Sequence, residues 1–105
     1  MIVLRNMDVK RIIAGIPRGH KHLRLVLEST SGIIVLHEAT VAAIVRSYIN
    51  IVAHPVRRGL ELVGTIPDNI KPGYAEHQLL ESNRSEREIL EELETILNEA
   101  YHRQS

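Results

Sequence analysis

The sequence predicts one α+β domain built as a two-layer sandwich, with two helices on one face of a mostly antiparallel sheet of four or five strands. Three observations predict this class. The 105 residues are too few for two domains. Hydrophobic residues make up 44% and charged residues 25%, as in globular proteins rather than disordered chains. Short apolar segments and two longer amphipathic segments alternate in the order (β)ββα-ββα, and strands joined by short turns favour antiparallel pairing.

The first part of the chain predicts a β-hairpin. Residues 9–16 are apolar and rich in β-branched side chains, which favours a strand, although the sequence leaves open whether this strand joins the main sheet. Glycine and proline interrupt the pattern over residues 15–19. Residues 22–29 then alternate between apolar and polar, as a half-buried strand does, and residues 30–32 form a turn before a second strand over residues 33–37.

A helix is expected to follow this hairpin. Thr40 is a suitable N-cap, and His54-Pro55 ends the helix because a residue before proline disfavours helical dihedral angles. The apolar residues recur at helical spacing and lie on one face: Val41, Ile44, Val45, Tyr48, Ile49 and Val52.

The second part repeats the layout of two strands and a helix. Strands are expected over residues 58–66 and 74–81, joined by a loop rich in turn-forming residues. Ser85 and Glu88 form a capping box, which predicts the start of the last helix. The apolar residues of this helix also share one face: Ile89, Leu90, Leu93, Ile96, Leu97, Ala100 and Tyr101.

The composition excludes several classes of function. The absence of cysteine excludes disulfides and thiolate metal sites, and it favours a cytoplasmic protein. The longest run without a charged residue is ten residues, 47–56, which is too short to cross a bilayer, so no membrane partner is expected. Only three aromatic residues are present, all tyrosine, so stacking platforms for single-stranded nucleic acid are not expected. No cofactor-binding motif appears.

Charge is distributed unevenly along the chain although the net charge is zero. Residues 1–27 hold six Lys and Arg against one Asp, a balance of +5, and residues 76–105 hold eight Glu against three Arg, a balance of −5. This asymmetry suits a contact between the basic and acidic ends, within one chain or between two copies.

The loop that follows the first apolar segment is the candidate ligand site. Its glycines allow close approach of a ligand to the backbone, and its side chains supply donors for an anion or for a nucleic-acid backbone. The simpler alternative is a solvated basic turn. The residues predicted to bind an anionic ligand are Arg18, His20, Lys21, His22 and Arg24.

Metal binding and catalysis have weaker support. His20 and His22 lie on one side of an extended chain, but a zinc site needs further ligands, and the neighbouring cations oppose one, so no metal is predicted. His37 and Glu38 are adjacent and would point to opposite faces of a strand. We therefore assign no catalytic residue, and an enzyme with a His/Glu site is the third hypothesis.

The first helix also indicates self-association. Its apolar stripe is wider than the roughly 100° that one sheet covers. We expect a homodimer with an interface over Val41, Ile44, Val45, Tyr48 and Ile51. The sequence thus predicts a small non-catalytic binding or interaction module that is homo-oligomeric. The alternative is an accessory protein that binds another protein and has no small ligand.

Overall fold

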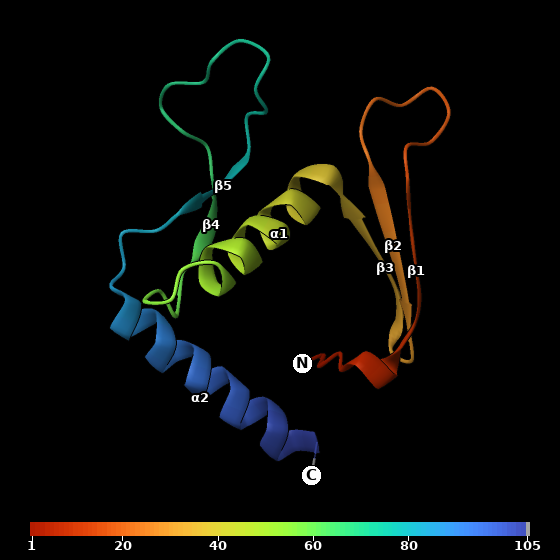
Figure 1. Cartoon of the computed structure of the whole chain (residues 1–105). Coiled ribbons are helices and arrows are strands. Elements are labelled where there is room, and N and C mark those ends of the chain that lie inside the picture. Colours follow the sequence, from red (N-terminus) through yellow and green to blue (C-terminus); the bar gives the residue numbers. More distant parts are fainter. Residues whose placement is uncertain (105) are drawn as a thin grey trace.

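The structure is a computed structural model in which one helix joins two separate antiparallel sheets (Figure 1). It describes the backbone over residues 1–104 and side chains over residues 1–102. The α+β class is confirmed. The expected single sheet of four or five strands, covered on one face by both helices, is not found, because the strands form a three-stranded and a two-stranded sheet.

The first sheet contains strands β1 (Val9–Gly15), β2 (Arg24–Ser29) and β3 (Gly32–His37), in the order β1-β2-β3. A short 3-10 turn, η1 (Asn6–Asp8), precedes it. The segment that the sequence left open is therefore an edge strand of this sheet, paired antiparallel with β2. The predicted hairpin corresponds to β2 and β3. Strand β2 starts at residue 24 rather than at residue 22, and β3 starts at Gly32 rather than at residue 33.

The register of β2 and β3 gives the first sheet two apolar faces. Leu27 pairs with Ile34, so these side chains share one face, while Val26 pairs with Val35 on the other. The leucine face is half-buried, whereas Val35 on the valine face is exposed. Apolar side chains therefore occur on both faces of this sheet, and on the valine face they lie beside charged residues of β2.

Helix α1 (Glu38–Val52) begins two residues before the predicted N-cap, Thr40, which lies inside the first turn. The N-cap is His37, whose side chain makes no capping hydrogen bond. The carboxylate of Glu38 instead accepts a hydrogen bond of 3.2 Å from the backbone N–H of Leu23, which ties the start of the helix to the segment before β2. The predicted end is confirmed, since Ala53 is the C-cap.

The two strands predicted over residues 58–66 and 74–81 are shorter in the structure. Strands β4 (Leu62–Thr65) and β5 (Gln78–Glu81) pair antiparallel, but the preceding residues 58–61 and 74–77 are not part of either strand. The 15 residues of α1 span about 22 Å along the helix axis, which carries the chain away from the first sheet. The second pair of strands forms a sheet of its own (Figure 1).

Helix α2 (Glu86–Gln104) starts at the predicted capping box. The backbone N–H of Glu88 donates to the Ser85 hydroxyl oxygen at 3.2 Å, and that hydroxyl donates to the Glu88 carboxylate at 2.9 Å. The first half of the box is therefore confirmed, while the Glu88 carboxylate accepts from the serine hydroxyl rather than from a backbone N–H.

The segment before β4 holds the first turns of α2. The backbone N–H of Arg58 donates to Glu86 at 2.7 Å, and an added Cβ at Gly59 would lie 3.0 Å from Leu90. Arg84 bridges Glu61 at 2.9 Å and Glu92 at 2.5 Å.

Neither helix within residues 1–104 combines the length and the apolar character that a membrane crossing requires.

The packing leaves the chain open. Ala43 and Ala100 are the buried apolar residues among those described. The radius of gyration is 16.2 Å, compared with about 13 Å for a compact domain of this length. A single chain therefore lacks a core of large side chains.

Candidate functional site

The predicted basic loop connects β1 to β2 and projects from one end of the first sheet (Figure 1). A turn forms within it, in which the backbone N–H of His20 donates to the Pro17 carbonyl at 3.0 Å. Gly19 adopts a φ of +80°, which a side chain would disfavour. This turn within the loop is therefore formed by the loop's own backbone.

The structure divides the five predicted ligand residues into two groups. Arg18, His20 and Lys21 are exposed, and no hydrogen bond or ion pair engages their side chains within residues 1–102, the part whose side chains are described. Arg24 turns back on the chain, and its Nη1 donates to the carbonyls of Leu23 at 3.1 Å and His22 at 3.3 Å. Only the first group has all its donors directed to solvent.

His22 is held by Glu38, the first residue of α1. Nδ1 of His22 lies 2.9 Å from the carboxylate of Glu38. This hydrogen bond, together with the one from the Leu23 backbone, holds the pKa of the Glu38 carboxyl below its ordinary value of 4.5. The pair fastens the end of the basic loop to the helix, and both side chains remain about half or more exposed. From the sequence, Glu38 was considered beside His37 and as one possible further metal ligand beside His22, but this direct contact was not predicted.

Metal binding and catalysis are the other functions that the sequence analysis raises for the histidines. Among the described residues, no three His, Asp or Glu side chains gather in a way that could hold a metal ion. The three cavities described below are not lined by His22 or Glu38.

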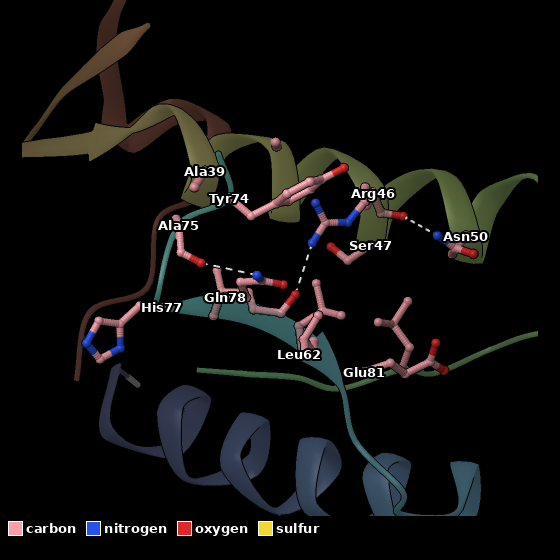
Figure 2. A pocket seen from close by; sticks show the side chains of 14 residues that line it. Ala39, Arg46, Ser47, Asn50, Leu62, Tyr74, Ala75, His77, Gln78 and Glu81 are labelled. Atoms are coloured by element: carbon pink, nitrogen blue, oxygen red, sulfur yellow. Dashed lines mark hydrogen bonds between the residues drawn. The ribbon is translucent and has the colours of Figure 1, made fainter. Parts of the chain in front are cut away.

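A cavity of about 440 Å³ lies between α1 and the second sheet (Figure 2). Arg46, Ser47 and Asn50 line it from the helix, and Tyr74 and Gln78 line it from the opposite side. Two of its polar side chains are engaged within the chain: Arg46 donates to the Leu79 carbonyl at 3.1 Å, and Gln78 donates to the Ala75 carbonyl at 3.1 Å. Sequence analysis did not predict this cavity, although its three helical residues are the clearly polar ones on an otherwise apolar helix.

Two smaller cavities adjoin the same region. One of about 290 Å³ lies beside Ala43 and Ile44 of α1, and one of about 190 Å³ lies beside Ile89 and Leu93 of α2. Leu60 lines all three cavities. The contact zone of α1, the second sheet and α2 is therefore loosely packed within one chain.

The predicted interface on α1 is partly bare. Ile44, Val45 and Tyr48 are exposed, with Tyr48 at 65%, whereas Val41 and Ile51 are half-buried against their own chain. The stripe continues along Ile49 and Val52, two exposed residues that the predicted interface omitted. We call the five exposed residues the α1 stripe: Ile44, Val45, Tyr48, Ile49 and Val52.

Other elements also expose large apolar side chains. These side chains lie on β1, β3 and the second half of α2. They are Ile12, Ile13, Ile33, Val35, Leu93, Ile96, Leu97 and Tyr101. The exposed apolar surface is thus distributed over most of the fold, and the α1 stripe is one part of it.

No protein-family model, curated protein or solved structure matches this chain.

Proposed function

We propose that the chain is a non-catalytic interaction module that works as a homodimer, in which a second copy completes the hydrophobic core. One observation carries this proposal: α1, β1, β3 and α2 each expose large apolar side chains, while two alanines are the buried apolar residues described. Soluble monomers rarely expose contiguous apolar patches beyond a few hundred Å².

The exposed area indicates how much surface a partner must cover. The chain exposes 8671 Å², whereas a compact monomer of 11.9 kDa exposes about 5,900 Å². The excess is about 2,700 Å² per chain, well above the ~800 Å² that each partner buries in a standard interface. An area of this size is typical of obligate dimers, whose interfaces resemble a domain core.

A second copy is the occupant that the charges favour. The basic residues 1–27 and the acidic residues 76–105 complement each other with balances of +5 and −5. Two copies can place these ends together without an external partner, and a C2 dimer is the commonest closed assembly. A second copy packed against α1 would also complete the two-layer sandwich that the sequence predicts. A different protein as partner is the alternative, and a wild-type chain that stays monomeric would favour it.

The basic loop supports a second function for the same module, the binding of an anionic ligand. Arg18, His20 and Lys21 present their donors to solvent at the end of the hairpin, and within residues 1–104 no partner neutralises them. Basic side chains of this kind bind the phosphates of a nucleic acid through their charge and do not read its base sequence. A homodimer would carry two such loops.

Sedimentation velocity on two matched variants tests the homodimer. Val52 lies in the α1 stripe and is 64% exposed, and Val56 lies just beyond the helix and is 87% exposed. Val52→Glu places a charge on the stripe, and Val56→Glu makes the same change outside it. Wild type and Val56→Glu are expected to sediment as dimers, and Val52→Glu to dissociate at a concentration at least tenfold higher. A folded wild type that remains at 11.9 kDa at every concentration would overturn the proposal.

A further inference from the structure

The two edge strands of the first sheet differ in how well they are protected from pairing with another chain. At the β1 edge the register shifts between Val9 and Arg11, and Lys10 lies at this irregularity. Arg11 also forms an ion pair of 2.6 Å with Glu28 of the neighbouring strand. Bulges and charged side chains are the features by which natural sheets block edge-to-edge pairing.

Strand β3 has none of these features. Its sequence, Gly-Ile-Ile-Val-Leu-His, contains no Lys, Arg, Asp, Glu or Pro. It pairs with β2 on one side, and within residues 1–104 no strand pairs with its other side. Because hydrogen bonds alternate along an antiparallel ladder, every second residue of β3 directs its backbone N–H and C=O to this open edge. An apolar, regular and unpaired edge is a template for another strand.

We propose that β3 pairs antiparallel with β3 of a second copy, which joins the two three-stranded sheets into one six-stranded sheet across the dimer. This inference rests on the proposed homodimer and names the surface through which it forms. Self-pairing through β3 brings no like charges together, whereas self-pairing through β1 would place Lys10 and Arg11 near their copies. The charges therefore select β3 of the two edges.

The pleat of the strand restricts the register of this pairing. Residues directly opposite each other share a face of the sheet, so a symmetric pair must join residues of equal parity. One residue of β3 then lies directly opposite its own copy, and the two-fold axis runs midway between the two. Axes at Ile34 or at Val35 pair five of the six residues of β3. Such an axis is perpendicular to the joined sheet, so both α1 helices, which follow β3 directly, lie on the same side of it.

Single cysteines test this register directly, because the chain contains no cysteine of its own. Opposite residues in an antiparallel pair have Cα atoms about 4.5–5.5 Å apart, which is within the range of a disulfide. The test uses Ile34→Cys and Val35→Cys, with Ile12→Cys on the β1 edge as the control. Under mild oxidation, one of the two β3 variants is expected to form a covalent dimer, while Ile12→Cys remains uncrosslinked.

A matched pair of charge variants provides a second measurement that does not depend on oxidation. Val35 and Ile12 are exposed to 57% and 58% and lie on opposite edges of the same sheet. Val35→Lys places two like charges near the axis and is expected to raise the dissociation constant of the dimer at least tenfold. Ile12→Lys is expected to leave it within about twofold of wild type.

The outcomes separate this inference from the homodimer on which it rests. A wild-type dimer in which neither β3 cysteine crosslinks and Val35→Lys still dimerises would overturn β3 pairing and leave the homodimer standing. Crosslinking through Ile12→Cys instead would place the contact at β1. A monomeric wild type would overturn both proposals.

Discussion

Arg46 of α1 donates a hydrogen bond of 3.1 Å from Nη2 to the backbone carbonyl of Leu79 in β5 (Figure 2). The two residues are 33 positions apart in sequence. Because α1 directly follows the last strand of the first sheet, this bond ties the second sheet to the first half of the chain.

Replacing Arg46 with Met is expected to loosen the second sheet. The variant keeps the long side chain but loses the donor, so the free energy of unfolding should fall by about 1 kcal/mol, the net contribution of a typical hydrogen bond. Hydrogen exchange at the amides of β5 should accelerate, while exchange in β2 should not change. Arg87→Met is the control, because Arg87 is an exposed helical arginine that pairs with Glu91, four residues along the same helix. Equal exchange rates at β5 in both variants would show that the Arg46 bond does not hold this sheet.

The contact between Glu38 and His22 predicts a dependence of stability on pH. The folded-state pKa of Glu38 lies below its ordinary value of 4.5, so the ionised carboxylate stabilises the fold above that pH. This contribution is lost as the pH falls from about 4.5 through the folded-state pKa. Glu38→Gln should therefore be less stable than wild type at pH 7, and the difference should shrink below pH 4.5, as measured by urea unfolding at several pH values.

The matched control for this pH dependence is Glu94→Gln. Glu94 is exposed on α2, and its carboxylate has no hydrogen-bond or ion-pair partner among the side chains described, those of residues 1–102. Its unfolding profile should follow that of wild type at every pH. If Glu38→Gln also followed wild type, the carboxylate would not hold the loop to the helix.

Removing the Ser85 hydroxyl is expected to weaken the start of α2. The Glu88 backbone N–H loses the oxygen to which it donates at 3.2 Å, and loss of an N-cap of this kind costs about 1 kcal/mol. Ser85→Ala should lower helical circular dichroism and the urea midpoint, whereas Ser85→Asp, which keeps an acceptor, should restore most of both. A wild-type urea midpoint in Ser85→Ala would contradict the role of this cap.

Local signals in the sequence were sufficient for several features. The Ser85 cap and the end of α1 near His54 each depend on residues a few positions apart, and both predictions hold. The alternation of residues 22–29 predicted a strand, and residues 24–29 of it form β2. In each case the physical cause lies within one turn or one strand, so a single sequence contains it.

Features set by distant contacts were not predictable in this way. The start of α1 at Glu38 depends on the Leu23 backbone, 15 residues earlier, and so the N-cap predicted at Thr40 was wrong. The division into two sheets depends on the position of the chain at the end of α1. Within the candidate site, the exposure of Arg18 and Lys21 follows from their charge, but the engagement of His22 by Glu38 needed the fold.

Polyanion binding by the basic loop is expected to depend on Arg18 and Lys21. In the Arg18→Ala/Lys21→Ala double variant, affinity for a short double-stranded DNA should be lost, and the salt dependence of binding should weaken by about one unit of slope per phosphate contact removed. Far-ultraviolet circular dichroism should be unchanged, since both side chains are exposed and unpaired within residues 1–104. Fluorescence anisotropy at several salt concentrations measures both effects.

The control for the loop is Arg87→Ala, which removes an exposed arginine from the acidic helix α2. It should bind the same DNA as wild type does. Unchanged affinity in the double variant would remove the loop from the candidate site.

The most direct test of the homodimer is the concentration dependence of thermal unfolding. If a second copy completes the core, folding and association are coupled, and the unfolding midpoint must rise with protein concentration. We expect the midpoint of wild type to increase steadily over a hundredfold range of concentration, with a folded species of twice 11.9 kDa. A midpoint that is independent of concentration, with a folded species of 11.9 kDa, would contradict the account.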